Sequence, residues 1–248
     1  MFLIVITGNV RSQFFQVYGY TTLDPSEKEF VYWTTLIPSS DHSYSFFGND
    51  VSRDGLFAHS LEFEYGLSPN WTIAFYMDFE QPKGESFKWV RTKAVMFHYS
   101  LFEKGLLPVD LALYGEYKLP RKDYKIAEEI EFKLIMEKDL GSHRLILNPT
   151  FEKKISGPEV GEGVEFALNG AYTFIRSTRF QPRLEYYSKM GELYDMNVFS
   201  DQKNYLFTSF DLFFGKYSQF RWHAGVGLGL TDPSDNIIIK SILSWEFF

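Results

Sequence analysis

The sequence of 248 residues contains no cysteine, so it forms neither a disulfide framework nor a thiolate metal site. It also lacks the run of roughly 18 apolar residues that a membrane-spanning helix requires. Basic residues are the minority charge, because 25 Lys and Arg stand against 32 Asp and Glu and give a net charge of −7. A chain with this balance has no basic surface to neutralise phosphates, and we expect no nucleic-acid partner.

Strand-forming aromatic residues are abundant: Phe, Tyr and Trp make up 19% of the chain. The last twelve residues show how they are arranged. Ile239 and Trp245 fall on one face of an extended chain and Lys240 and Glu246 on the other, because successive strand side chains point to opposite faces. The same alternation recurs along the sequence. It is typical of a transmembrane β-barrel, which has a polar lumen and an apolar exterior.

The alternation predicts an all-β protein: a single antiparallel, up-and-down transmembrane barrel of about twelve strands. These strands are expected at residues 28–38, 56–67, 70–80, 86–101, 108–119, 126–140, 142–154, 163–175, 178–188, 204–215, 219–230 and 235–248. Short turns such as 66–70 alternate with longer polar loops such as 39–55 and 189–203. Outer-membrane barrels have short periplasmic turns and long external loops, so an even strand number predicts that both termini are periplasmic.

The first residues do not fit the barrel pattern. Residues 2–6 form a short apolar run that no Lys or Arg precedes, and Val10-Arg11-Ser12 resembles a cleavage site before Gln13. We interpret residues 1–12 as the remnant of a signal peptide whose start was truncated, and residues 13–248 as the outer-membrane barrel domain. The alternative is that residues 1–12 are a frayed strand of that domain.

Charged residues on the predicted lumen face are the candidates for solute selectivity. They are Glu62, Glu64, Asp78, Asp110, Glu116, Glu129, Glu131, Lys133, Glu152, Glu165, Arg183, Glu185, Asp211, Arg221 and Lys240. Acids outnumber bases, which favours a lumen that accepts cations and neutral hydroxyl-rich solutes. The alternative is a charge network that only stabilises the inside of a narrow barrel. Strict alternation puts Arg91, Lys93 and Val95 on the outward face, and Pro149 and Pro182 predict local bulges because neither can donate to a ladder.

Aromatic residues gather where the predicted strands meet the short turns. They are Tyr65, Trp71, Tyr99, Phe174, Phe214, Trp245 and Phe247. Such a girdle predicts contact with outer-membrane lipid at the water interface. We further expect the C-terminal strand to be recognised by the barrel-assembly machinery, and the barrel to be a monomer.

The sequence offers one enzyme hypothesis, the pair His98 and Ser100. An outer-membrane lipid hydrolase needs a Ser nucleophile, a nearby His and a third polar group. Alternation places both side chains in the lumen, away from lipid, and the neighbouring strand supplies only Asp110. No glycine-rich phosphate loop, zinc-ligand spacing or nucleotide motif is present. We therefore predict no catalytic residue, no metal site and no cofactor.

Several blocks of the sequence resemble a known group of proteins. They are residues 61–71 (LEFEYGLSPNW), 97–105 (FHYSLFEKG), 109–117 (VDLALYGEY), 225–235 (GVGLGLTDPSD) and the terminal Trp245-Glu-Phe. They resemble a family of uncharacterised Gram-negative outer-membrane β-barrels that are often labelled transporter-like, and more distantly the barrels encoded with aromatic-degradation pathways. The resemblance covers most of residues 55–248. It implies an outer-membrane barrel and carries over no catalytic residues.

These observations favour a bacterial outer-membrane β-barrel that acts as a narrow passive channel for small hydrophilic or cationic solutes. Two alternatives stay open. One is a non-conducting structural or receptor barrel that acts through its external loops. The other, in third place, is an outer-membrane lipid hydrolase. The sequence leaves the transported solute and the openness of the lumen undetermined.

Overall fold

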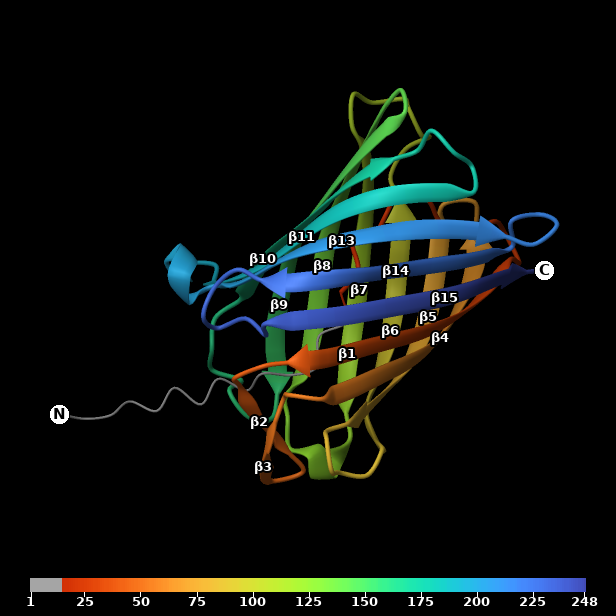
Figure 1. Cartoon of the computed structure of the whole chain (residues 1–248). Helices are drawn as coiled ribbons and strands as arrows, with labels where there is room; N and C mark the ends of the chain where they lie inside the picture. Colours follow the sequence, from red (N-terminus) through yellow and green to blue (C-terminus); the bar gives the residue numbers. More distant parts are fainter. Residues whose placement is uncertain (1–14) are drawn as a thin grey trace.

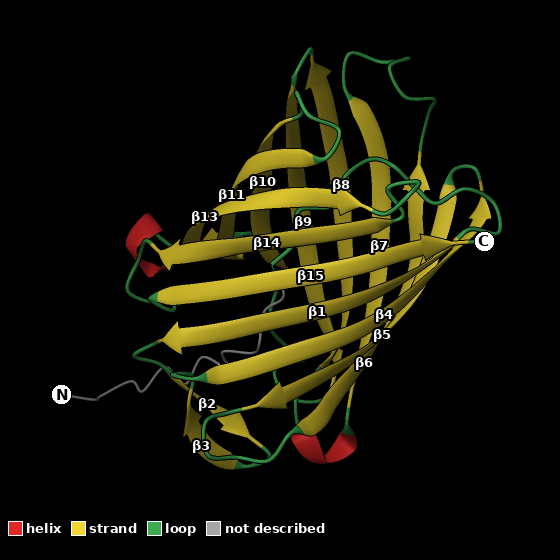
Figure 2. Cartoon of the chain, turned by 45° about the vertical axis from the view of Figure 1, so that its right-hand side comes forward, coloured by secondary structure: helices red, strands yellow, loops and turns green. Residues whose placement is uncertain are grey.

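The computed structural model describes residues 15–248, and the interpretation of residues 1–12 lies outside this range. Twelve long strands close into an antiparallel, up-and-down barrel, which confirms the predicted fold class (Figures 1 and 2). They are β1 (Lys28–Ser39), β4 (Leu56–Ser68), β5 (Trp71–Gln81), β6 (Lys88–Ser100), β7 (Asp110–Pro120), β8 (Glu128–Leu140), β9 (His143–Ser156), β10 (Glu165–Phe174), β11 (Phe180–Glu192), β13 (Lys203–Phe214), β14 (Phe220–Gly229) and β15 (Ile237–Phe247). The minor elements are β2 (Ser43–Phe46), β3 (Asn49–Ser52), β12 (Asp195–Met196) and the 3-10 helices η1 (Lys122–Tyr124) and η2 (Phe199–Asp201). Within residues 15–248, the structure contains no helix with the length and apolar character needed to cross a membrane.

The barrel closes where the first and last strands meet. β1 pairs with β15 from Lys28 opposite Phe247 to Ser39 opposite Ile237, and every other long strand pairs with its neighbours in sequence. Closure removes the free edges that would leave backbone N–H and C=O groups unpaired in hydrocarbon, at several kcal/mol for each group.

The two ends of the barrel differ in their connections. One end, which we call the turn end, carries short connections such as residues 69–70 and 141–142, and a longer one at 101–109. The other end, which we call the loop end, carries the β2–β3 hairpin, η1 and η2 (Figure 1). β1 begins and β15 finishes at the turn end. That the turn end is periplasmic stays a prediction.

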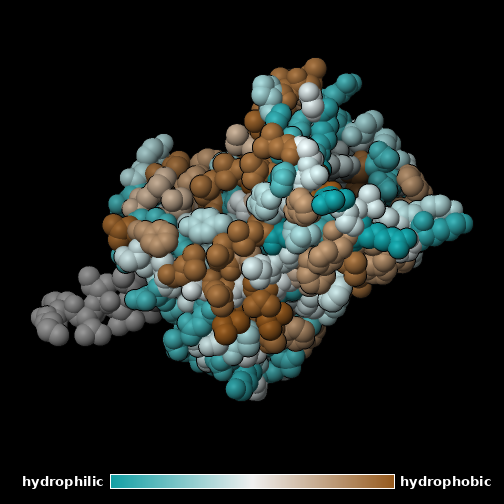
Figure 3. Space-filling view, turned by 45° about the horizontal axis from the view of Figure 1, so that its top comes forward, coloured by the Kyte–Doolittle hydropathy of each residue, from teal (hydrophilic) through white to brown (hydrophobic). Residues whose placement is uncertain are grey.

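The outer and inner surfaces of the barrel differ as the alternation predicted. Large apolar side chains such as Phe63, Phe75 and Trp222 are exposed on the outside, and Figure 3 shows hydrophobic residues spread over the outer surface of the strands. Charged side chains such as Glu62 and Lys240 are buried inside. A water-soluble protein rarely exposes so continuous an apolar surface, whereas a barrel in lipid requires it.

Strand β6 departs from strict alternation, so the prediction for its first half was wrong. Arg91, Lys93 and Val95 are 8%, 7% and 4% exposed and face the lumen. The register of β6 shifts against β7 between Val95 and Phe97, and against β5 at the same level. This is a β-bulge, in which one extra residue (here Met96, 49% exposed) reverses the faces of the residues that precede it, as far as the second register shift against β5 next to Arg91.

The predicted bulges at the two prolines were also wrong. On β9 the register against β8 is the same on both sides of Pro149, although the ladder is interrupted there. Pro182 of β11 stays in register opposite Phe210 of β13. A proline removes one donor without adding a residue, so the ladder loses a hydrogen bond and keeps its register.

Candidate functional site

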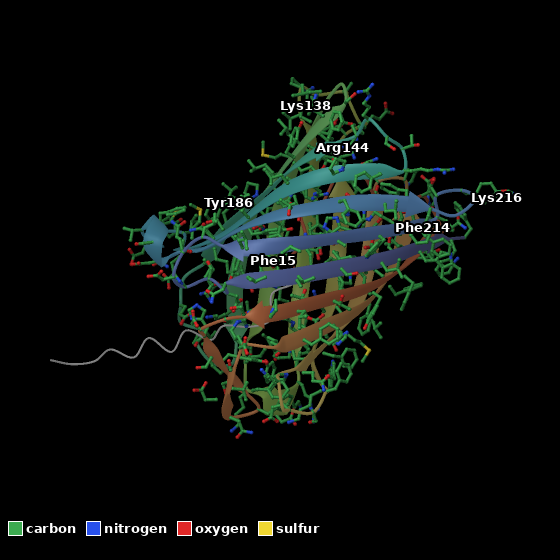
Figure 4. All side chains as sticks on the ribbon, viewed as in Figure 1. Phe15, Lys138, Arg144, Tyr186, Phe214 and Lys216 are labelled. Atoms are coloured by element: carbon green, nitrogen blue, oxygen red, sulfur yellow. The ribbon has the colours of Figure 1, made fainter. Side chains whose placement is uncertain are left out.

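The lumen contains part of the chain itself. Residues 15–27, which precede β1 and which we call the inner segment, run inside the barrel toward the turn end. Phe15, Val17 and Tyr20 are almost fully buried. The ring of Phe15 (labelled in Figure 4) lies 5.1 Å from that of Tyr187 and 4.9 Å from that of Phe207, both lumen-facing residues. The sequence prediction did not include this segment.

Side chains of the barrel wall form hydrogen bonds with the backbone N–H and C=O groups of the inner segment. Asn148 of β9 accepts a hydrogen bond from the Tyr18 N–H at 2.8 Å and donates one to the Tyr18 carbonyl at 3.1 Å. Three further side chains donate to carbonyl groups of the segment: Lys240 to Phe15, Arg183 to Val17 and Ser100 to Tyr20. Two backbone N–H groups of the segment donate to the wall: that of Tyr20 to Glu137 and that of Leu23 to Thr72. Buried backbone groups without such partners would be costly. Side chains of the lumen wall therefore bind the backbone of the inner segment.

One glycine makes room for the inner segment at the turn end. A Cβ atom at position 66 would lie 2.1 Å from the carbonyl oxygen of Asp24. The backbone there also exchanges hydrogen bonds, from the Ser26 N–H to the Gly66 carbonyl and from the Gly66 N–H to the Glu27 carbonyl, both 2.9 Å. Only glycine allows this close approach, so Gly66 was the sequence feature that could have indicated a chain passing against β4.

Above the inner segment, a cavity of about 1400 Å³ extends from the loop end into the barrel. Its floor includes Tyr18 of the inner segment together with Trp33 and Tyr76. The hydroxyl groups of Tyr18 and Tyr76 lie 3.3 Å apart, and the ring centroids of Tyr18 and Tyr114 lie 4.7 Å apart. Aromatic side chains, partly from the inner segment, thus meet across the lumen at this level.

One wall of the cavity carries alternating acids and bases on β6 to β10. The ammonium group of Lys118 lies 2.7 Å from Glu131 and 2.9 Å from Glu152, and Lys133 also contacts Glu131. On β6, which the bulge turns inward, Arg91 pairs with Asp78 at 2.8 Å. Bases therefore neutralise much of the acidic charge at this level.

A second charge network lies across the barrel on β11 to β15. Glu185, 1% exposed, pairs with Lys240 and with Arg183, the latter at 2.8 Å. Asp211 lies 3.0 Å from the Nδ1 atom of His223. Lys240 and Arg183 also hold the inner segment, so this network connects the wall to the chain inside it.

The predicted lumen residues fall into three groups in the structure. Glu116, Glu129, Glu131, Lys133, Glu152 and Glu165 line the cavity. Asp78, Arg183, Glu185, Asp211 and Lys240 belong to ion pairs deeper in the wall. Glu62, Glu64, Asp110 and Arg221 lie toward the turn end, where Asp110 accepts a hydrogen bond from the Gly105 N–H. Their role in selectivity stays a prediction.

The predicted girdle residues lie where their strands reach the turn end. Trp71 and Tyr99 are opposite each other on β5 and β6, with ring centroids 6.5 Å apart. Trp245 lies 4.7 Å from Phe247 on β15. Tyr65, Phe174 and Phe214 complete the set on β4, β10 and β13.

His98 and Ser100 do not form a site at the lipid surface. Both face the lumen, and the Ser100 hydroxyl donates a 2.8 Å hydrogen bond to the Tyr20 carbonyl of the inner segment. The ring of His98 packs against Tyr114. The serine thus holds the backbone inside the barrel, and lipid does not reach it.

A buried ion pair fixes the covering of the loop end, and the sequence prediction missed it. Arg53 and Asp235 are each 1% exposed and make two hydrogen bonds of 2.7 Å, while Ser40 donates a third to Asp235. Burial by itself raises the pKa of the Asp235 carboxyl, but the hydrogen bonds and charge of Arg53 lower it below the ordinary value. The pair joins the loop that contains β2 and β3 to the β14–β15 loop. Residues so far apart in sequence gave no local signal.

No model of a known protein family matches the chain, and no curated protein sequence is significantly similar to it. Solved structures do match. A COG4313 outer-membrane channel from Pseudomonas putida F1 superposes with a TM-score of 0.66 at 13% identity, covering 92% of this chain and 98% of the other. The KdgM porin in complex with disordered oligogalacturonate superposes with a TM-score of 0.61 at 8% identity, covering 89% and 99%. At these identities the likeness concerns the fold.

The closed twelve-stranded wall, the apolar exterior and these neighbours agree with one another. The chain has the fold of the bacterial outer-membrane β-barrels, and the two solved structures compared above are an outer-membrane channel and a porin.

Proposed function

We propose that this barrel is a narrow passive channel for small hydrophilic solutes, with a preference for cations and with its turn end toward the periplasm. The observation that carries the proposal is the cavity of about 1400 Å³ that opens at the loop end and is lined by charged and hydroxyl side chains. A wall of this chemistry solvates ions and polar solutes in place of water. The solute needs no cofactor to pass.

In this proposal the inner segment sets the width of the channel. It lies below the cavity and is held by hydrogen bonds from side chains of the wall, among them Asn148 and Ser100, and by backbone hydrogen bonds with Gly66 at the turn end. It has no β-ladder with the wall among the described strands. A segment held this way can shift without breaking the barrel, because closure depends on β1 and β15 alone.

Single-channel recording of the refolded protein in planar bilayers tests the proposal. We expect small steps with a reversal potential that indicates cation preference in a KCl gradient. The double variant Asn148→Ala/Ser100→Ala loses three hydrogen bonds to the inner segment and is expected to give larger steps. Leu145→Ala, on the exposed outer face of β9, is the matched control. If neither the folded wild type nor the folded double variant gives current steps, the channel proposal is overturned.

A non-conducting barrel that binds a partner through its loops is the second candidate. One observation favours it: Tyr194, Val198 and Phe199 in the β11–β13 loop are 96%, 66% and 58% exposed. Apolar side chains this exposed on a loop are typical of contact surfaces. A silent barrel in the recordings above would move this candidate to first place.

A further inference from the structure

Four glutamates gather on the lumen side of three adjacent strands at the turn end. Glu246 of β15 lies directly opposite Glu29 of β1, and Glu29 lies directly opposite Glu64 of β4. Glu62 follows on the same face of β4. Figure 2 shows β15, β1 and β4 side by side. We call these four residues the glutamate quartet.

The quartet differs from most of the other lumen acids in lacking ion pairs. Glu131, Glu152, Glu185 and Asp211 each lie close to a Lys, Arg or His nitrogen. Within residues 15–248, no ion pair involves any member of the quartet. Like charges directly opposite each other on adjacent strands destabilise a sheet. The folded chain therefore leaves this charge to be neutralised from outside.

Buried polar atoms without partners lie beside the quartet. The Ser244 hydroxyl is on the lumen side of β15, two residues before Glu246, and its side chain is 2% exposed. It has no hydrogen-bond partner among the described residues, and neither does the Oε1 atom of Glu62, which is 1% exposed. The other Glu62 oxygen accepts a 2.7 Å hydrogen bond from the Trp33 indole. Buried polar groups normally have partners. The Ser244 hydroxyl can accept or donate and the Glu62 oxygen can accept, so a ligand that carries N–H donors would complete both.

The geometry of the quartet selects among cations. Within residues 15–248 no three Asp, Glu or His side chains converge closely enough to hold a metal ion. Instead Glu246, Glu29 and Glu64 form a row across three strands, which spans roughly 10 Å at the usual spacing between strands. A linear chain of ammonium groups matches such a row, because each ammonium offers several N–H donors to carboxylates.

One neighbouring base leaves the negative charge in excess. The charge of Arg221 on β14 acts on Glu29, Glu64 and Glu246, but the carboxylate with which Arg221 forms an ion pair is that of Asp211, at 3.7 Å. The accessibility of the row increases from the buried Glu62 to the exposed Glu246 at the mouth. A ligand therefore approaches from the turn end.

We infer that the glutamate quartet is a binding site for a linear polyamine that enters from the turn end of the barrel. Its ammonium groups would lie against Glu246, Glu29 and Glu64, and one of its N–H donors would reach the free oxygen of Glu62. The site goes beyond the proposed channel, since binding at the mouth requires no conduction.

Calorimetric titration of the folded protein in detergent with spermidine tests the inference. We expect saturable binding by the wild type and about tenfold or greater weakening in Glu29→Gln/Glu64→Gln, because charge-assisted hydrogen bonds are the stronger ones. Glu85→Gln/Glu103→Gln removes the same amount of charge away from the quartet and is expected to bind as the wild type does. Circular dichroism checks that all three proteins are folded.

Three results would overturn the site: no binding by the wild type, equal weakening in both double variants, or Mg²⁺ binding where spermidine does not. The assay measures no current, so its result is independent of the channel. A barrel that binds spermidine but is silent in bilayers would overturn the proposed function and support the quartet as a binding site.

Discussion

The two halves of the lumen are built from the same alternating strands and yet differ in their electrostatics. Toward the loop end, acids and bases alternate on neighbouring strands, and Lys118 alone contacts Glu131 and Glu152. At the turn end, Glu29 lies opposite Glu64 and Glu246, and none of these three carboxylates forms an ion pair among residues 15–248. The two halves of the lumen both contain acids, and they differ in whether those acids have ion-pair partners.

The largest effect should come from removing one partner of a buried pair. Glu185→Gln leaves Lys240, 2% exposed, without its carboxylate. We expect a loss of about 3–5 kcal/mol in the free energy of unfolding, because an uncompensated charge then stays buried. Urea unfolding of the protein in lipid vesicles measures it. An unchanged urea midpoint in Glu185→Gln would mean that the ion-pair networks contribute no stability. The two halves of the lumen would then not differ in this respect.

A smaller loss is expected at the covering of the loop end. Asp235→Asn keeps the size of the side chain but removes the charge that faces Arg53, and we expect a loss of about 1.5–3 kcal/mol. Thermal unfolding measures it, with the exposed Asp232→Asn as control.

The Arg53–Asp235 pair also predicts how the stability of the protein depends on pH. The pKa of Asp235 is lower in the folded protein than in the unfolded chain, where it is about 3.9. Its contribution is therefore complete above that value and is lost as the pH falls through the lower, folded-state pKa. The wild type should lose stability below about pH 4 more steeply than Asp235→Asn. Parallel curves would contradict this assignment.

Neutralising one carboxylate of the glutamate quartet should increase the free energy of unfolding, whereas the two substitutions above decrease it. Glu64→Gln removes a repulsion with Glu29, and we expect a gain of about 0.2–1 kcal/mol in the free energy of unfolding. The experiment is the same urea unfolding that is used for Glu185→Gln. A clear loss of stability in Glu64→Gln would show that this carboxylate is already neutralised inside the fold.

The smallest effect concerns ion selectivity. Glu62→Gln removes a carboxylate without an ion-pair partner, whereas Glu131→Gln removes one held by Lys118 and Lys133. We expect Glu62→Gln to reduce the cation preference in a KCl gradient by about twofold, a change of about 0.4 kcal/mol at the ~1.4 kcal/mol that corresponds to tenfold. Glu131→Gln should shift the reversal potential less. A larger shift in Glu131→Gln than in Glu62→Gln would assign the cation preference to the cavity at the loop end.

The sequence predicted the wall of this barrel closely and the contents of its lumen poorly. Expected strands such as 28–38 and 126–140 match β1 (Lys28–Ser39) and β8 (Glu128–Leu140) within two residues. The reason is that a period of two, interrupted by turn residues, is a local property of the chain. The same logic failed on β6, because the bulge at Met96 is defined against β5 and β7 and not by β6 alone.

By itself the sequence determined the fold class, the number of strands and which face of most strands is charged. The tertiary structure decided three further things: that the inner segment enters the lumen, that Lys118 and Lys240 neutralise particular acids, and that no member of the glutamate quartet has an ion-pair partner among the described residues. The physical reason is distance along the chain. Alternation acts between adjacent residues, whereas charge pairing and filling of the lumen depend on strands that meet only when the barrel closes.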